Sequence, residues 1–283
     1  MRQWAKTVFV LLVSTAAVLS GQTAAPSPAA PELLNSVLWA QTSVEHDAAY
    51  LQAFRLARLM LDRGRVDRTW TAAIEQSAGY ERLPAAVILD IDETILDNSP
   101  EEAQKFRTGP QASLWSDWVK QERATALPGA IEFTHYADSL GVAVFYVTNR
   151  DASTKPVTRR NLAQLGFPLN AHTDPILCRG EKPEWGTDKG SRRAAIAARY
   201  RILLLIGDDL NDFLSGVRAT PDERRRLVAA YADRWGERWI VLPNPMYGSW
   251  ETALYNHKIE LSYTDQVQQK RGHLRGMDAV RSH

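Results

Sequence analysis

Two acidic residues separated by one position, Asp90 and Asp92, stand directly after the apolar run Ala85–Leu89. Such a run is typical of a strand that is buried on both faces, and this pattern puts the two acids at its carboxyl end. Residues i and i+2 of an extended segment point the same way, so one carboxylate could attack a substrate while the other carries a proton. Buried acids need a compensating cation. A plain strand ending in an acidic turn is the alternative interpretation.

A second acidic group follows the apolar segment Ile202–Ile206 and contains Asp208, Asp209 and Asp212. The same argument applies here, because three acids at a strand end repel one another unless a cation lies between them. A ligand set made only of oxygen atoms, with water completing the shell, favours Mg²⁺ over zinc. The sequence therefore predicts a magnesium site formed at the ends of two strands.

Two further polar positions fit such a site. Thr148 and Asn149 follow the predicted strand Val142–Val147, and a threonine hydroxyl there could donate to a phosphate oxygen. Lys189 lies in the first turn of a predicted helix, where its charge opposes the helix dipole. That placement is explained if the lysine reaches a phosphate group and the surrounding acids. An ordinary polar turn and a surface lysine are the alternatives.

The elements that position these residues alternate between strands and helices, which predicts an α/β fold with a parallel sheet. Ligands of such sheets bind at the carboxyl ends of the strands. The expected strands are 85–89, 142–147, 175–178, 202–206 and 239–242. The expected helices are 33–61 with a break near Thr42 and Ser43, 63–83, one or two within 101–127, 128–140, 153–165 and 188–200. The segment around 98–127 is expected to form a small helical cap over the strand ends.

Composition excludes several function classes. The 34 basic and 33 acidic residues nearly balance, so no nucleic-acid polymer is expected as a partner. The single cysteine, Cys178, excludes an internal disulfide and a zinc site made of several cysteines, and its apolar neighbours predict a buried thiol. The 283 residues are expected to comprise one large domain over 31–262 and a polar tail over 263–283 that packs loosely.

The N-terminus has the order of a secretory signal. Arg2 and Lys6 precede the apolar run Val8–Leu19, and a Pro/Ala-rich stretch over 21–31 follows. This order predicts a cleaved signal peptide within 1–30 and a periplasmic or secreted protein. Because no cysteine follows the apolar run, no lipid anchor and no stable membrane anchor are expected, although an uncleaved signal is the weaker alternative.

The motifs together resemble a known family. In chain order they are N-S-V-L-W-A-Q-T-S from Asn35, D-I-D-E-T-I-L-D-N-S-P from Asp90, L-P-G-A, F-Y-V-T-N-R, K-G-S-R and G-D-D-L-N-D-F. They resemble the class C bacterial acid phosphatases, the group of the haloacid dehalogenase superfamily that includes lipoprotein 5′-nucleotidases. The resemblance covers nearly all of the chain after the signal, and it implies a Rossmann-like α/β domain with a small helical cap. The missing lipid-anchor cysteine is a departure from many members of the family.

The resemblance also implies roles for single residues. Asp90 would be the nucleophile, and Asp92 would be the general acid and base. Mg²⁺ would be held by Asp90, the backbone carbonyl of Asp92 and Asp208, with Asp212 acting as a water-mediated ligand or as a partner of Lys189. Asp209 occupies a variable position of the motif and receives no role. The substrate-binding residues would be Thr148, Asn149, Lys189, Arg192 and Tyr247.

The resemblance implies hydrolysis of small phosphomonoesters, with nucleoside 5′-monophosphates as the favoured substrates. A broad-specificity sugar or aryl phosphatase and a catalytically idle phosphate-binding protein are the alternatives. Tyr247 would stack against a nucleobase, or else it would only close the core with Trp250. A homo-oligomer is compatible with the sequence.

Overall fold

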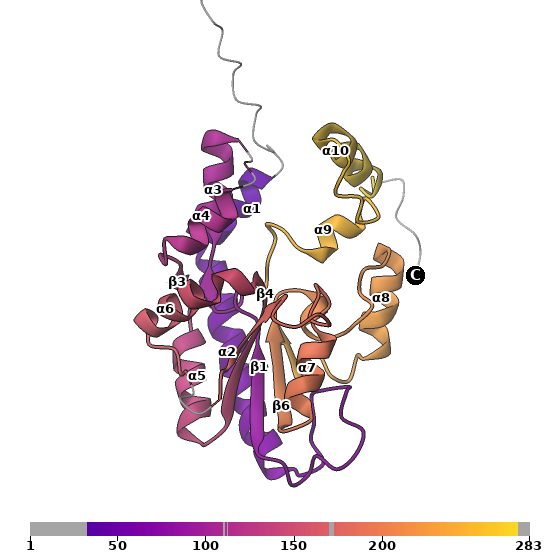
Figure 1. Ribbon diagram of the computed structural model, residues 1–283. Coiled ribbons are helices and arrows are strands. Elements are labelled where there is room, and N and C mark those ends of the chain that lie inside the picture. The colour runs from indigo at the N-terminus through magenta and orange to yellow at the C-terminus, as the bar shows by residue number, and fades with distance from the viewer. Residues whose placement is uncertain (1–32, 110, 112, 170–172, 277–283) are drawn as a thin grey trace, which may run out of the picture.

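The computed structural model describes residues 33–109, 111, 113–169 and 173–276. At its centre lies a parallel sheet of five strands in the order β5-β4-β1-β6-β7 (Figure 1). The strands are β1 (Ala85–Leu89), β4 (Ala143–Asp151), β5 (Ile176–Arg179), β6 (Arg201–Gly207) and β7 (Trp239–Val241). The predicted parallel α/β sheet is confirmed.

The central strand β1 is buried on both faces, as its apolar run predicts. Val87 and Leu89 belong to one apolar core, while Ala86 and Ile88 belong to the other. Alternate side chains of a strand point to opposite faces, so an unbroken apolar run is what a strand covered on both sides requires. The site at the end of β1 therefore sits on a rigid support.

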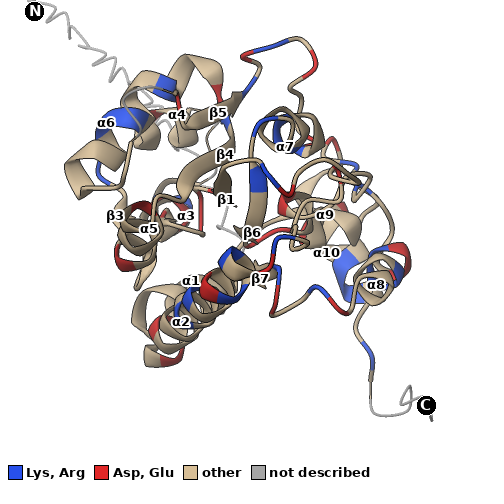
Figure 2. Ribbon diagram, turned by 90° about the horizontal axis from the view of Figure 1, so that it is seen from below, with Lys and Arg blue, Asp and Glu red and all other residues tan. Residues whose placement is uncertain are grey.

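Helices cover both faces of the sheet, as the view along the strands shows (Figure 2). On one side lie α1 (Leu34–Thr42), α2 (Val44–Val66), α5 (Ala130–Ser139) and α6 (Lys155–Leu165), which follows the 3-10 turn η2 (Ala152–Thr154). On the other side lie α7 (Gly190–Ala197) and α8 (Pro221–Ala230). The predicted break between the first two helices is confirmed, because Ser43 caps α2 by accepting hydrogen bonds from the Glu45 and His46 backbone N–H groups.

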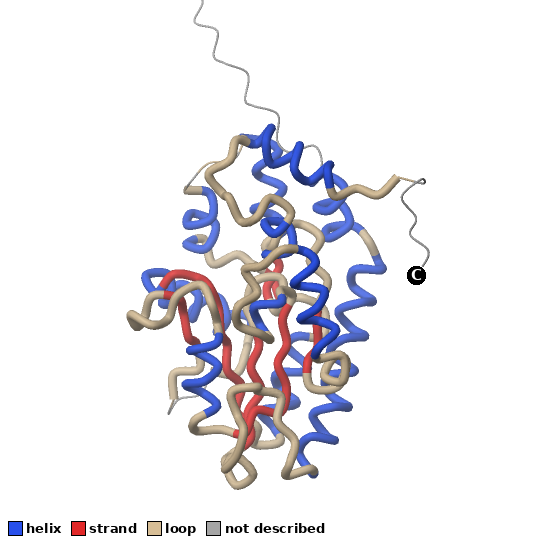
Figure 3. Tube along the Cα trace, turned by 90° about the vertical axis from the view of Figure 1, so that its right-hand side faces the viewer, coloured by secondary structure: helices blue, strands red, loops and turns tan. Residues whose placement is uncertain are grey.

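The segment over the carboxyl ends of the strands contains two helices and a short ribbon. The helices are α3 (Ser99–Thr108) and α4 (Leu114–Lys120), and the antiparallel ribbon pairs β2 (Leu96–Asp97) with β3 (Thr125–Ala126). Across the same end of the sheet lie α9 (Ser249–Ala253) and α10 (Tyr263–Gly272) (Figures 1 and 3). The carboxyl ends of the strands therefore lie between two sets of helices.

The helix predicted over 63–83 is wrong. Helix α2 ends at Val66, and the chain then runs without a helix to β1. This segment bonds to β6 instead of forming a helix. The Ala72 N–H donates to the Ile202 carbonyl at 2.7 Å, and the Trp70 indole donates to the Leu203 carbonyl at 2.8 Å. These two bonds and the burial of Trp70 hold the segment against the sheet in place of a helix.

Other elements differ from the prediction as well, among them α8, α9 and the ribbon of β2 and β3, which were not predicted. Strand β4 continues past Val147 to Asp151, with a shift in its register against β5 between Thr148 and Asp151. The polar C-terminal segment begins with helix α10, which has no buried residue and is tied to α9 by an ion pair of 2.5 Å between Lys270 and Glu251. The acidic loop after β6 contains the 3-10 turn η3 (Leu210–Asp212).

The predicted signal segment 1–30 lies outside the described residues. Among the helices of the described part, none combines the length and apolar character needed to cross a membrane. Cys178 is buried in β5, as predicted, and burial raises the pKa of its thiol to about 12.

Candidate active site

Three carboxylates meet where β1 and β6 end. Asp90 follows β1, and both Asp208 and Asp212 follow β6, and one oxygen of each lies within 4.8 Å of the others. Strands β1 and β6 are neighbours, and the Asp90 N–H donates to the Ile206 carbonyl at 2.9 Å. The backbone hydrogen bonds between the two strands therefore align their carboxyl ends. A Cβ atom at Gly207 would lie 2.1 Å from Asp212 Oδ2, so only glycine lets η3 fold back this closely.

Lys189 joins two of these carboxylates. Its Nζ lies 2.5 Å from Asp90 Oδ1 and 2.6 Å from Asp212 Oδ1, and all three side chains are at most one-tenth exposed. Lys189 is the N-cap residue of α7, one position before the first turn in which it was predicted, so the start of that helix places the lysine at the strand ends. Burial disfavours its charge, but Asp212 and Asp90 outweigh this effect and raise the pKa of Lys189.

The carboxylates carry more negative charge than one lysine can offset. Burial raises the pKa of Asp90 to about 7, against the opposing effect of Lys189. Burial and the neighbouring Asp212 and Asp90 raise the pKa of Asp208 well above its usual range, and burial also raises the pKa of Asp212. A divalent cation among these oxygen atoms would remove the excess charge, so the donor set fits a hard ion.

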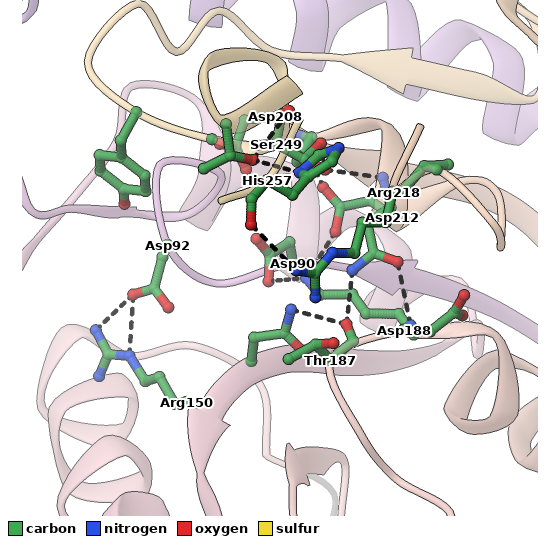
Figure 4. Close-up of a pocket in the computed structure, with 18 of the residues that line it drawn as sticks. Asp90, Asp92, Arg150, Thr187, Asp188, Asp208, Asp212, Arg218, Ser249 and His257 are labelled. Atoms are coloured by element: carbon green, nitrogen blue, oxygen red, sulfur yellow. Dashed lines mark hydrogen bonds and ion pairs between the residues drawn. The ribbon is translucent and has the colours of Figure 1, made fainter. Parts of the chain in front are cut away.

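Asp92 is turned away from this group. Its Oδ1 atom accepts hydrogen bonds from Arg150 Nε at 2.9 Å and from Asn98 Nδ2 at 3.0 Å, and Arg150 Nη2 lies 2.8 Å from it. Its Oδ2 atom lies 3.3 Å from the Thr148 hydroxyl. Figure 4 shows Asp92 and Arg150 on one side of the pocket, and Asp90, Asp208 and Asp212 together on the other. The two acids of the D-x-D pair therefore have different partners.

The other predicted substrate residues lie at different depths. Asn149 lines the pocket, and its amide donates to the Thr187 carbonyl at 3.0 Å. Arg192 is fully buried, and its guanidinium donates to the carbonyls of Thr148 and Gly186 and to Asn149 Oδ1. Because these acceptors occupy Arg192, the geometry favours a positioning role for it over direct contact with substrate. Tyr247 lines the pocket, and its buried hydroxyl has no hydrogen-bond partner among the described residues.

Several supporting residues received no role from the sequence. Thr94 donates to Asp208 Oδ1 at 3.2 Å, and Asn244, in the loop after β7, donates to Asp208 Oδ2 at 2.8 Å. Thr94 is the last residue of the D-x-D-x-T motif, which was the available signal for it, whereas nothing in the local pattern marks Asn244. Asp209 caps η3 and accepts from the Ser249 N–H and hydroxyl, both at 2.7 Å, which gives this variable position a structural task.

The pocket lined by Asp90, Asp92, Lys189, Asp208 and Asp212 has a volume of about 680 Å³, within the usual range for small-molecule sites. Helices α3 and α4 contribute its wall on the side of Asp92, with Glu101, Glu102, Lys105 and Trp115. The pocket is also lined by residues that follow β6 and β7, among them Arg218, Tyr247, Thr252, His257 and Ile259. The cavity is therefore larger than a phosphate group alone requires.

Comparisons with known proteins agree with this geometry. Residues 7–250 match the family model described as HAD superfamily, subfamily IIIB (acid phosphatase). The chain is similar to the structure of a class C acid phosphatase from Bacillus anthracis, with 33% identity, a TM-score of 0.76, and coverage of 87% of this chain and 98% of that one. A tungstate-bound structure of the Bacillus anthracis class C acid phosphatase matches with 32% identity over the same shares and the same TM-score.

Curated relatives from plants match in part. They include a stem 31 kDa glycoprotein of Glycine max, 30% identical over 172 residues, which are 56% of this chain and 58% of that protein. Acid phosphatase 1 of Solanum lycopersicum is 28% identical over 167 residues, which are 56% of this chain and 57% of that protein. The chain thus spans somewhat more than half the length of these curated relatives. The family match covers most of the chain, and we conclude that it belongs to the acid phosphatases of HAD subfamily IIIB.

Proposed function

We propose that this chain is a phosphomonoesterase that works through a covalent aspartyl-phosphate on Asp90. The observation that carries this proposal is the meeting of Asp90, Asp208 and Asp212 with Lys189 at adjacent strand ends, inside a pocket large enough for an ester. The family and the class C acid phosphatase of known structure indicate the same reaction class. An idle phosphate-binding protein would have no chemical need for both acids of the D-x-D pair.

Asp90, Asp208 and Asp212 would hold a divalent cation, with the backbone carbonyl of Asp92 as a further ligand, and we propose Mg²⁺ as that ion. Their oxygen-only donor set and the excess of carboxylates over lysine support this choice. When bound, the ion would offset the repulsion between a carboxylate and a phosphate dianion and stabilise charge on the phosphoryl oxygens.

In the first step a carboxylate oxygen of Asp90 attacks phosphorus, and the bond from phosphorus to the ester oxygen breaks. Lys189, already 2.5 Å from Asp90, would orient the nucleophile and, with Thr148, bind the phosphoryl oxygens. Asp92 gives its proton to the leaving oxygen. In the second step Asp92 takes a proton from water, which attacks phosphorus and releases Asp90 together with inorganic phosphate.

We propose nucleoside 5′-monophosphates as favoured substrates. The aromatic side chains of Trp115 and Tyr247 in the pocket lining and the volume of about 680 Å³ support a large, flat leaving group. The same openness is compatible with a broad-specificity phosphatase for sugar or aryl phosphates. We further propose a periplasmic or secreted location, on the basis of the apolar N-terminal segment of the sequence.

The test combines a substrate panel with one isosteric variant. Wild-type protein is assayed on nucleoside monophosphates, a sugar phosphate and an aryl phosphate, with Mg²⁺ and with chelator. Asp90→Asn is expected to lower kcat by roughly 10⁴-fold or more, because an amide is a poor nucleophile. Mass spectrometry of acid-quenched reactions should detect a phosphorylated enzyme in the wild type and none in the variant.

The neighbouring acid Asp209 provides the matched control. Asp209→Asn makes the same change of charge at a strand end. Asp209 caps η3 and accepts a hydrogen bond from Ser249, and it is not one of the three carboxylates that meet at the site. The variant should retain most of the activity. Asp90→Asn with a substantial fraction of the wild-type kcat would reject Asp90 as the nucleophile.

A further inference from the structure

The two oxygen atoms of the Asp92 carboxylate have different kinds of partner. Oδ1 faces three nitrogen atoms: Arg150 Nε at 2.9 Å, Arg150 Nη2 at 2.8 Å and Asn98 Nδ2 at 3.0 Å. Oδ2 faces the Thr148 hydroxyl at 3.3 Å. A guanidinium and an amide NH₂ group can only donate hydrogen bonds, whereas a hydroxyl can donate or accept. Oδ1 is therefore confined to accepting.

The Thr148 hydroxyl is free to change its role. Its oxygen accepts the Arg150 backbone N–H at 3.0 Å, which uses one lone pair and leaves its own proton and a second lone pair available. It can donate to an ionised Oδ2, and it can also accept from a protonated one. The asymmetry of its partners thus makes Oδ2 the oxygen of Asp92 through which a proton can be exchanged.

Arg150 is held in place by contacts from several elements. Its side chain is 1% exposed, Nη1 donates to the Thr158 hydroxyl at 3.2 Å in α6, and Nη2 also reaches Asn98 Oδ1 at 3.4 Å. Asn98 Oδ1 in turn accepts from the Trp118 indole of α4 at 2.8 Å. A guanidinium fixed by this many partners has little freedom, so it constrains the carboxylate it binds.

Resting on the proposed function, we propose that Arg150 is a positioning residue: with Asn98 it fixes Asp92 Oδ1 and so directs Oδ2 at the leaving oxygen. Arg150 also lies 5.6 Å from the Trp115 ring centroid, and Trp115 lines the pocket wall on this side. The same guanidinium therefore orders both the acid and an aromatic side chain of the leaving-group wall. Arg150 itself donates to Asp92 and takes no part in bond breaking.

The test is a double-mutant cycle of Arg150→Met and Asp92→Asn, read on an alkyl phosphate (glycerol phosphate) and on an aryl phosphate. Methionine keeps the apolar stem of Arg150 and removes every donor. Arg150→Met should lower kcat on the alkyl ester on the order of 10²-fold, because a misplaced catalytic group costs about that much. The loss on the aryl ester should be at least fivefold smaller, because its leaving group needs less protonation. In the Asp92→Asn background, Arg150→Met should cause no further loss.

Two measurements separate positioning from a merely structural role. Inhibition by inorganic phosphate should keep its constant within about twofold in Arg150→Met, since the substitution leaves Lys189 and the backbone N–H that the Thr148 hydroxyl accepts in place. Arg150→Lys, which keeps the charge but cannot offer two donors to Oδ1, should show an intermediate loss with the same preference for the aryl ester. It also serves as the second variant if Arg150→Met does not fold.

Arg201→Met is the matched control. Arg201 is also a buried arginine, but it lies at the start of β6 and donates to the carbonyls of Gly64 and Asp67 at 3.0 and 2.6 Å. It should lower the melting temperature and leave the alkyl-to-aryl rate ratio unchanged. Equal losses of activity for Arg150→Met on both esters, or additive losses in the double variant, would overturn the positioning role of Arg150 but not the proposed function. A wild type that hydrolyses neither ester would overturn the proposed function and this role with it.

Discussion

Replacing Lys189 by methionine should destabilise the metal-free protein strongly at pH 8. Lys189 lies 2.5 Å from Asp90 and 2.6 Å from Asp212, and its side chain is 5% exposed. Removing one partner of a buried ion pair typically costs about 3–5 kcal/mol, because the remaining charges are left uncompensated. For a domain of this size, about 2–4 °C of melting temperature is lost for each kcal/mol. We therefore expect a fall of roughly 6–20 °C in chelator.

Lys155 offers a matched comparison on the surface. It also joins two carboxylates, Asp174 and Glu181, both at 2.6 Å, but Asp174 is 47% exposed and Glu181 is 22% exposed. Exposed ion pairs contribute about 0–1 kcal/mol, so Lys155→Met should lower the melting temperature by no more than about 4 °C. The two variants therefore remove the same kind of bridge, and they differ mainly in burial.

The loss at Lys189 should depend on pH in a defined direction. Burial raises the pKa of Asp90 to about 7 in the folded protein, above its ordinary value of 3.8 in an unfolded chain. The folded state then binds more protons between these values, so the free energy of unfolding falls as pH rises from about 4 to about 7. Without Lys189 the pKa of Asp90 should rise further. At pH 5 protonation replaces the missing lysine, and the destabilisation should be smaller than at pH 8.

The assay is thermal unfolding of wild type, Lys189→Met and Lys155→Met at pH 5 and pH 8, with chelator and with Mg²⁺. A cation bound among the carboxylates stabilises only the folded state, so Mg²⁺ should raise the melting temperature of Lys189→Met more than that of the wild type. A loss at pH 8 no larger than that of Lys155→Met, or a loss that grows towards pH 5, would refute this reasoning.

Two further predictions concern the metal and the leaving group. Asp208→Ala should abolish Mg²⁺ binding by calorimetry while the fold is retained, and unchanged affinity would reject Asp208 as a ligand. Tyr247→Ala should raise KM for nucleoside monophosphates roughly tenfold, as expected from stacking worth about 1–3 kcal/mol, and should leave glycerol phosphate little affected. A parallel loss on both substrates, or a lower melting temperature with unchanged selectivity, would instead assign Tyr247 to packing.

The strands that carry the acids were predictable because their signal is local. Ala85–Leu89 is confirmed to the residue as β1, and the apolar segment before Asp208 lies within β6. A parallel strand covered on both faces has to be continuously apolar, so the run of apolar residues and its acidic end fix where a side chain enters the site. The convergence of Asp90 with Asp208 follows from one further rule, that the carboxyl ends of parallel strands share an edge of the sheet.

The segment before β1 was mispredicted because its hydrogen-bond partners are distant in sequence. Trp70 donates to the Leu203 carbonyl, 133 positions along the chain, and Ala72 donates to the Ile202 carbonyl. Apolar spacing alone cannot distinguish a helix from a chain that lies along the edge of a core. Asn244 was missed for the same reason, because its bond to Asp208 depends on where β7 ends beside β6.

The role of Arg150 combines strand alternation, which the sequence predicts, with a bonding partner that the sequence does not identify. In a regular strand, neighbouring side chains point to opposite faces, so Thr148 and Arg150 would share a face and Asn149 would oppose them. The register of β4 against β5 shifts between Thr148 and Asp151, but this alternation of side chains is kept. The side chains of Thr148 and Arg150 then meet the two oxygen atoms of one carboxylate, while Asn149 bonds to Arg192. The T-N-R sequence marks the position and alternation orients its side chains, whereas the partner of Arg150 lies 58 positions away, at Asp92, and could not be identified from local spacing.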